Sequence, residues 1–221
     1  MKKQISSWLL LAMLAASILF LGQLERSSFP LLFTFYSIAF GAYILILNQS
    51  KSVFSLKIWI VIGITLRALT LFALPNLSDD LYRFIWDGWL ITEGINPFAY
   101  RPTEILHGAI PGLTADPELF DRLNSQPYYS IYPALSQYFF AASYLLDFTH
   151  SWLGFSTILK LMFIGFEAAS FFFIISILKA FGQNHERLLI YLLNPLIIIE
   201  LCGNLHFECL MICCFLGTVY F

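Results

Sequence analysis

Two adjacent carboxylates, Asp79 and Asp80, stand where a long run of apolar residues ends. Neighbouring acids repel each other and are costly to remove from water, above all next to a segment with the composition of a lipid-buried helix. They are therefore expected to face water, a metal or a reacting group. Helix capping in a water-facing loop is the simpler interpretation, whereas a general base or a phosphate or metal site is the functional one.

Arg83 and Asp87 extend this polar pattern. Ser78 predicts an N-cap, and a helix that follows it places Asp80, Arg83 and Asp87 on one face. The opposite face is apolar and aromatic, made of Tyr82, Ile85, Trp86 and Trp89. Such a helix is typical of a membrane surface, with its aromatic side chains directed toward lipid or the bundle and its charges toward a cavity. Arg83 either forms an ion-pair ladder with the neighbouring acids or holds a phosphate.

Arg67 lies inside another apolar run. A charge at the centre of a membrane span costs about 2.5 to 3.5 kcal/mol on insertion scales, so it must face a cavity or an opposite charge. Glu167 and Glu200 are the candidate partners, and a structural ion pair is favoured over catalysis. Lys160 and Glu167 are interpreted in the same way.

A second polar cluster, Glu200, Asn204, His206 and Glu208, interrupts the apolar sequence near the end of the chain. It predicts a site at the membrane boundary, where Gly203 can break a helix. The spacing is too sparse for a metal site, so a hydrogen-bonded pair of His206 and Glu208 is expected.

An aromatic cluster, residues 128–133 (YYSIYP), precedes a further apolar run. It is expected to lie at the membrane interface, and carbohydrate stacking is the second interpretation. The four cysteines contain no CxxC pair, so no zinc site is predicted.

The composition identifies an integral membrane protein. Of the 221 residues, 59% are hydrophobic and only 12% are charged, against about a quarter in a soluble domain. The net charge of −2, without a basic patch, argues against nucleic acid as a partner. An all-α, polytopic transmembrane helical bundle is expected, with apolar segments at 8–24, 29–47, 58–74, 131–148, 155–181, 188–201 and from 209 on.

The region 79–130 is predicted to be one external loop. Lysines 2, 3, 51 and 57 fall on one side by alternation, which the positive-inside rule makes cytoplasmic. The loop holds eight of the fourteen acids and three of the twelve basic residues, as expected for a non-cytoplasmic segment. Residues 100–126 should be irregular, and 131–148 should be a short, tilted or re-entrant helix.

Several of these blocks together resemble those of the GT-C membrane glycosyltransferases, and most closely the bacterial mannosyltransferases that use polyprenyl-phosphate mannose. The blocks are residues 78–88 (SDDLYRFIWDG), 94–98 (GINPF), 131–133 (IYP), 193–196 (LNPL) and 203–208 (GNLHFE). Ala134 replaces a usual second proline, and Glu208 replaces a common aspartate. Members of this superfamily have ten or more spans, so residues 1–221 are expected to be a single, incomplete transmembrane module, a fragment or a truncated product.

The resemblance implies transfer of a hexose, mannose being favoured, from a polyprenyl phosphate to a lipid or glycan hydroxyl on the outer face of a bacterial cell membrane. Asp79 or Asp80 would act as the general base. No cofactor is expected, and a divalent metal is permitted but not required. The candidate substrate-binding residues are Arg83, Trp86, Asp87, Asn96, Tyr132, Gln137, Glu200, Asn204, His206 and Glu208. The alternatives are a transporter or flippase, with Arg67, Glu167 and Glu200 lining a solute path, and an inactive remnant.

Overall fold

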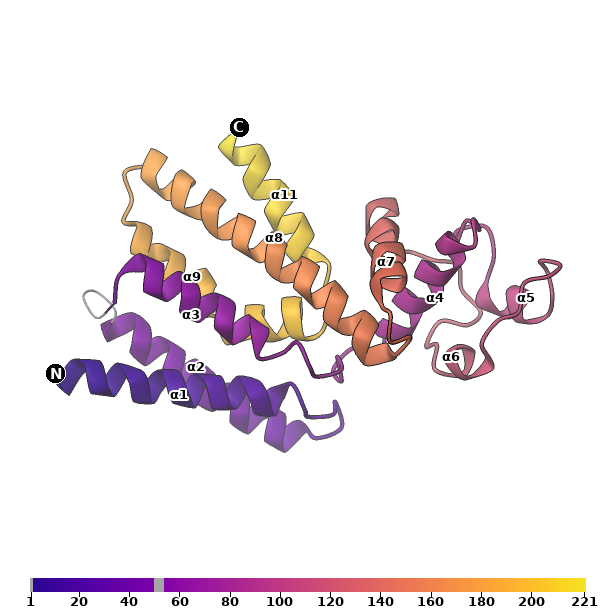
Figure 1. Ribbon diagram of the computed structural model, residues 1–221. Coiled ribbons are helices and arrows are strands. Elements are labelled where there is room, and N and C mark those ends of the chain that lie inside the picture. Colours follow the sequence, from indigo (N-terminus) through magenta and orange to yellow (C-terminus); the bar gives the residue numbers. More distant parts are fainter. Residues whose placement is uncertain (1, 50–53) are drawn as a thin grey trace. The chain divides into compact units, whose positions relative to one another are not determined.

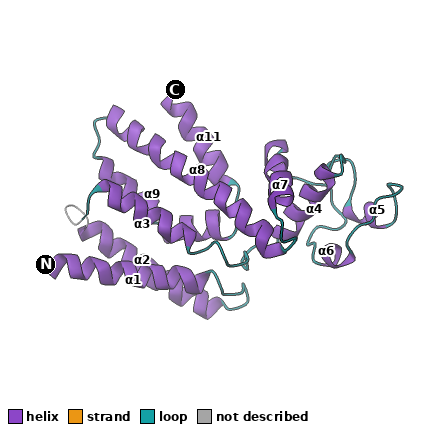
Figure 2. Cartoon of the chain, in the orientation of Figure 1, coloured by secondary structure: helices purple, strands orange, loops and turns teal. Residues whose placement is uncertain are grey.

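The computed structural model describes residues 2–49 and 54–221, and these residues form helices and loops without a strand (Figures 1 and 2). The all-α prediction is confirmed. Lys51, one of the lysines on which the predicted orientation depends, lies outside the described residues. The chain divides into two compact units, which we call the bundle unit (Met1–Leu77 with Lys160–Phe221) and the loop unit (Ser78–Leu159).

The bundle unit begins with a helical hairpin, α1 (Lys2–Leu21) and α2 (Phe29–Gln49), which lie side by side in Figure 1. Its remaining helices are α3 (Leu56–Ala68), α8 (Trp152–Ala180, of which the part from Lys160 belongs to this unit), α9 (Leu189–Leu192), α10 (Pro195–Ile197) and α11 (Glu208–Tyr220). The apolar core joins side chains from α1, α2, α3, α8 and α9, including Leu14, Ile18, Ile46, Trp59, Phe171 and Leu192.

Two helices of the described chain, α2 and α8, are long and apolar enough to cross a membrane. A third span is formed if the bent pair Pro195–Gly203 and Glu208–Tyr220, which meet at 111°, is taken as one. The predicted span at 58–74 is wrong in length, because α3 ends at Ala68 after 13 residues. At 1.5 Å per residue this helix reaches about 20 Å, short of the ~30 Å hydrocarbon core.

Three charged side chains of the bundle unit, those of Arg67, Lys160 and Glu167, are completely buried. Arg67 donates from Nε and Nη2 to one oxygen of Glu167 at 2.9 and 2.7 Å, and neither side chain is exposed. The predicted choice of a structural ion pair is therefore confirmed, with Glu167 as the partner. Lys160 differs from its prediction, because its Nζ donates to the backbone oxygens of Thr70 and Ala73, at 2.8 and 2.5 Å, rather than to a carboxylate.

The predicted helical stretch at 188–201 is broken. A 3₁₀ turn, His185–Leu188, leads into α9, and a π-helical turn, Ile198–Gly203, follows α10. Asn194 caps α10 by accepting from the Leu196 amide at 3.0 Å, with Pro195 at the first helical position. The chain turns at Leu205, a non-glycine residue with φ of 61°, before α11 begins.

The loop unit contains α4 (Leu81–Thr92), α5 (Pro102–Leu106), α6 (Pro117–Asp121), α7 (Ala134–Leu146) and the beginning of α8. Helices α4 and α7 pack closely, with the rings of Phe84 and Phe140 stacked at 4.4 Å. Gly88 permits this approach, because a Cβ atom there would lie 2.6 Å from the Phe140 carbonyl oxygen. Helix α7 has only 13 residues, which agrees with the prediction of a short helix within residues 131–148.

Two local predictions in the loop unit need correction. The N-cap of α4 is Asp80 rather than Ser78, whose hydroxyl instead accepts from the Asp80 amide at 3.3 Å. Residues 100–126 are not wholly irregular, because prolines at the first helical positions start α5 and α6. The charged and aromatic faces of α4 exist as predicted, since no residue of this helix is exposed and Arg83 lines a cavity.

Candidate active site

A cavity of about 290 Å³ lies in the loop unit next to the first turn of α4. Asp80 and Arg83 line it from α4, and Tyr132 lines it from the segment before α7. The other lining residues are Asn124, Ser125, Tyr128, Tyr129 and Ile131. Tyr128 and Ile131 are strongly exposed, so one edge of the cavity is both apolar and open.

Asp80 is held at this cavity by two polar neighbours. The Asn124 amide donates to its Oδ1 at 3.3 Å, and the Tyr132 hydroxyl hydrogen-bonds to its carboxylate. Burial raises the pKa of Tyr132 above its ordinary value, and the negative charge of Asp80 raises it more. Tyr132 therefore stays protonated at neutral pH and acts as a donor. Asp79 is exposed and is not among the residues that line the cavity.

Arg83 is anchored behind the cavity by Asp87. Its Nε donates to Asp87 Oδ1 at 2.8 Å, and both side chains are almost completely buried. Nη1 donates to the backbone oxygen of Tyr128 at 3.0 Å and to both oxygens of Ser125 at 3.3 and 3.2 Å. Nη2 is buried and makes no hydrogen bond to the described residues. One guanidinium nitrogen of a cavity-lining arginine thus lacks a partner, but it is closed off from solvent, so an anionic ligand reaches it only by displacing part of the cavity wall.

Both carboxylate oxygens of Asp87 accept hydrogen bonds from the protein. Its second oxygen, Oδ2, accepts from the Ser130 hydroxyl at 2.5 Å and from the Gln137 amide at 3.0 Å. The same amide also donates to the Ser130 hydroxyl at 2.9 Å. The network therefore joins α4, the loop and α7, and it orients Arg83.

Two further predicted residues of this unit lie elsewhere. Trp86 is buried, with its ring 5.2 Å from that of Trp89, and it packs in the core. Asn96 is exposed, and its side chain accepts from the Phe98 amide at 3.0 Å in a turn after α4. Neither residue lines the cavity that Asp80 and Arg83 share.

The second predicted cluster lies in the bundle unit and is centred on Glu200 in the π-helical turn. Tyr36 donates to Glu200 Oε1 at 2.9 Å, Asn204 donates to Oε2 at 3.3 Å, and His206 Nδ1 lies 3.8 Å from Oε2. His206 therefore pairs with Glu200 rather than with Glu208, which is exposed in the first turn of α11. A π-helical turn and a left-handed Leu205 are the kind of local distortion that clusters at functional sites.

No group of three His, Cys, Asp or Glu side chains within residues 2–49 and 54–221 is placed to hold a metal ion. The available polar chemistry is that of carboxylates, a guanidinium, phenols and amides. This set suits the binding of a sugar and an anion.

The family model of the alpha-(1->6)-mannopyranosyltransferase N-terminal domain matches residues 36–221. The chain belongs to this mannosyltransferase family. Neither a curated protein nor a solved structure matches it. Membership establishes a glycosyltransferase that needs a sugar donor and an acceptor, and the long apolar helices agree with a membrane protein.

The structure also brings residues that sequence reasoning missed to the cavity and to Asp87. Asn124 and Ser125 line the cavity, and Ser130 holds Asp87, yet none was a candidate. They lie more than forty residues from their partners in a segment without periodicity. The available signal was local: Ser130 stands within the aromatic cluster of 128–133.

Proposed function

We propose that this mannosyltransferase moves a mannosyl group from a polyprenyl phosphate to an acceptor hydroxyl on the non-cytoplasmic face of the membrane. The observation that carries the proposal is that a carboxylate, Asp80, and an unsatisfied guanidinium nitrogen, Arg83 Nη2, belong to residues lining one cavity. Glycosyl transfer from a sugar phosphate needs a proton acceptor for the incoming alcohol and a partner for the departing phosphate.

Asp80 is the proposed general base. The acceptor oxygen bonds to the anomeric carbon, its proton passes to the Asp80 carboxylate, and the bond from that carbon to the phosphate oxygen breaks. The electron pair of the broken bond leaves with the polyprenyl phosphate. General base catalysis of this kind contributes about 10²- to 10⁴-fold to the rate, and positioning supplies more.

Arg83 is the proposed phosphate-binding residue. Its anchoring by Asp87 fixes the guanidinium before substrate arrives, which lowers the ordering cost of binding. Tyr128 and Ile131, 66% and 85% exposed, give the cavity an apolar edge along which a polyprenyl chain can lie. The leaving phosphate carries its own charge, so the proposal requires no metal or cofactor.

Tyr132, which holds Asp80, is a further proposed substrate contact, and the Glu200, Asn204 and His206 cluster is proposed as a separate binding site within the bundle unit. The excess of acids over basic residues between positions 79 and 130 supports a non-cytoplasmic location for the loop unit. The transporter alternative loses its main support, because Arg67 and Glu167 are fully buried and bonded to each other.

Membranes that contain the full-length protein test the proposal. They are incubated with radiolabelled polyprenyl-phosphate mannose, and labelled glycolipid is measured. We expect Asp80→Asn to abolish transfer with expression preserved, because the amide keeps the size of the side chain but cannot accept the proton. Asp121→Asn, a change at an exposed acid of α6, is the control and should retain the wild-type rate. Normal turnover in Asp80→Asn would remove this residue from the mechanism, and Asp79→Asn then tests its neighbour.

A further inference from the structure

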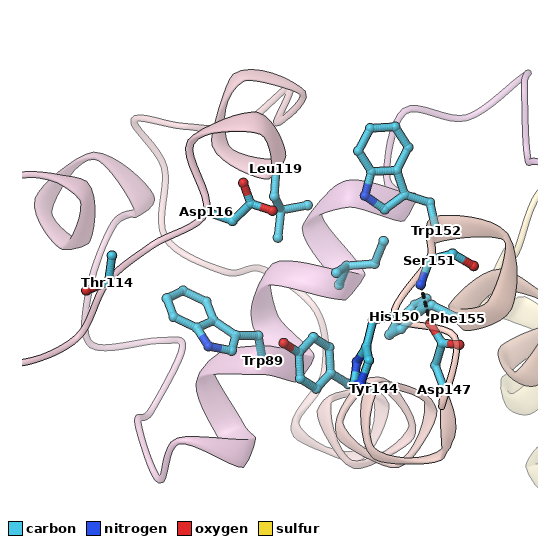
Figure 3. A pocket seen from close by; sticks show the side chains of 11 residues that line it. Trp89, Thr114, Asp116, Leu119, Tyr144, Asp147, His150, Ser151, Trp152 and Phe155 are labelled. Atoms are coloured by element: carbon cyan, nitrogen blue, oxygen red, sulfur yellow. Dashed lines mark hydrogen bonds between the residues drawn. The ribbon is translucent and has the colours of Figure 1, made fainter.

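A second cavity, of about 300 Å³, lies within the loop unit on a different face of α4 (Figure 3). Ile85 and Trp89 line it from α4, whereas Asp80 and Arg83 line the first cavity. Its other walls come from the segment around α6, from the end of α7 and from the start of α8. None of its lining residues was a candidate site residue.

Aromatic rings form much of this wall. Trp89, Tyr144 and Trp152 come from three different helices and all line the cavity that Figure 3 shows. The Trp152 ring is held in place because the Arg122 guanidinium lies 4.0 Å from its centroid and Tyr82 meets it edge-on at 5.2 Å. Rigid aromatic rings bury a large apolar area at little cost in conformational entropy.

Two polar side chains in the cavity wall, those of Asp116 and Tyr144, can orient a bound ligand. Asp116 uses Oδ1 to cap α6, accepting from the Glu118 amide at 2.9 Å, which leaves its other oxygen for a ligand. Burial raises the pKa of the Tyr144 phenol, and the charges of Glu93 and Asp116 add to this, so the hydroxyl remains a donor at neutral pH. The cavity thus offers both a donor and an acceptor beside its rings.

Asp147 builds the opposite rim. Its Oδ1 accepts from the Thr149 amide and hydroxyl at 3.0 and 2.6 Å, and its Oδ2 accepts from the Ser151 amide at 2.9 Å. These bonds fix the turn that carries His150, which is exposed and has a left-handed backbone with φ of 47°. A non-glycine residue held in this conformation is strained and persists where the surroundings impose it, often at ligand sites.

The charge of the wall identifies the class of ligand. No lysine or arginine lines the cavity among the described residues, whereas Asp116 and Asp147 do. A phosphate or carboxylate ligand is therefore disfavoured, and the carboxylates are not grouped for a metal ion. Aromatic rings can stack on a neutral sugar ring, and the hydrogen-bond donor and acceptor beside them can bind its hydroxyl groups.

We propose that this second cavity is a subsite for a neutral saccharide, and that it holds a mannose unit of the acceptor glycan. The role as acceptor subsite rests on the proposed mannosyl transfer, whereas saccharide binding does not. The first cavity, with Arg83, takes the anionic donor headgroup, and the second takes the uncharged sugar.

The test measures binding of α-(1→6)-linked mannotetraose to the detergent-solubilised full-length protein by saturation-transfer NMR titration. We expect Tyr144→Phe and Asp116→Asn to weaken binding about 3- to 10-fold each, the loss of one hydrogen bond. Asn retains the capping oxygen, and Phe retains the ring, so both variants should fold. The matched controls are Tyr138→Phe, at an exposed tyrosine of α7, and Asp121→Asn, and both should bind as the wild type does.

A measurement without variants uses diethyl pyrocarbonate, which modifies accessible imidazoles. Mannotetraose should slow the modification of His150 and leave that of His107, an exposed histidine outside this cavity, unchanged. Equal protection of both histidines, no binding by the wild type, or equal affinities for the variants and their controls would overturn the subsite.

The outcomes also separate the two proposals. If the wild type transfers no mannose yet binds mannotetraose at His150, the proposed function fails and the saccharide site stands. If transfer proceeds and Tyr144→Phe has the wild-type KM for the acceptor, the acceptor subsite fails and the proposed function stands.

Discussion

Arg83 and Asp87 form a buried ion pair one helical turn apart, with Nε 2.8 Å from Oδ1. The pair does more than stabilise α4. Arg83 Nη1 also donates to Ser125 and Tyr128, and Asp87 Oδ2 accepts from Ser130 and Gln137. The loop that forms the first cavity is thus fastened to the helix that carries Asp80. Asp87 is accordingly assigned a positioning role, since both of its oxygens are engaged by the protein.

Asp87→Asn should destabilise the protein by about 3–5 kcal/mol, because it leaves the Arg83 charge buried without a counter-ion. The measurement is thermal unfolding of the solubilised protein by circular dichroism, with Asp121→Asn as the control. A substrate contact at Asp87 would instead raise KM without changing the unfolding temperature.

The ion pair of Arg67 and Glu167 should show strong coupling. Glu167→Leu alone should cost about 3–5 kcal/mol, because it leaves the buried guanidinium charge unpaired. Removing both charges in Arg67→Leu/Glu167→Leu should cost less than the sum of the two single changes, by about 0.5–3 kcal/mol. Unfolding of all four proteins in one detergent provides the double-mutant cycle, and strict additivity would contradict a direct pair.

These pairs show how far sequence reasoning reaches. A charge in an apolar run must find a partner, so the pairing of Arg67 with an acid was predictable. The choice between Glu167 and Glu200 was not, because it depends on the register of α3 against α8. Lys160 was mispredicted because backbone carbonyl oxygens in the turns that follow α3 satisfy its ammonium group, and no side-chain pattern signals them.

The candidate active site was likewise predictable only in part. The end of an apolar run marked Asp80, and helical spacing placed Arg83 and Asp87 on its face. The partners from residues 124–130 were not predictable, since a loop without periodicity gives no rule for its path. The second cavity draws on α4, on the segment around α6, and on the stretch from the end of α7 to the start of α8, and its aromatic residues have no special spacing in the sequence.

Gly88→Ala should destabilise the packing of α4 on α7 by about 1–3 kcal/mol. The new Cβ would lie 2.6 Å from the Phe140 carbonyl oxygen and 2.8 Å from its carbon, and backbone atoms cannot move aside as a side chain does. The matched control is Gly41→Ala in α2, where nothing lies within 4 Å of the added atom. Alanine there should be neutral or stabilise the helix by up to about 1 kcal/mol. Thermal unfolding compares the two variants, and equal effects would argue against the close approach.

The contact between Arg101 and Glu104 should make the local stability of α5 depend on pH. Glu104 Oε2 accepts from the Arg101 amide at 2.8 Å and its Oε1 from the guanidinium at 2.6 Å, and these bonds lower the pKa of the carboxyl below its usual 4.5. A lowered folded-state pKa gives stability that is present above the unfolded pKa and is lost as pH falls through the folded one.

We therefore expect Glu104→Gln to reduce protection of the His107 amide, which donates to Thr103 in α5, at pH 7 but not well below pH 4.5. Hydrogen exchange read by mass spectrometry gives the protection at each pH. The control is Glu118→Gln, at an acid that is 71% exposed and 3.7 Å from Arg122, and it should leave α5 unchanged at every pH. A difference between wild type and Glu104→Gln that stays constant down to the lowest pH would show that the carboxylate charge does not stabilise α5.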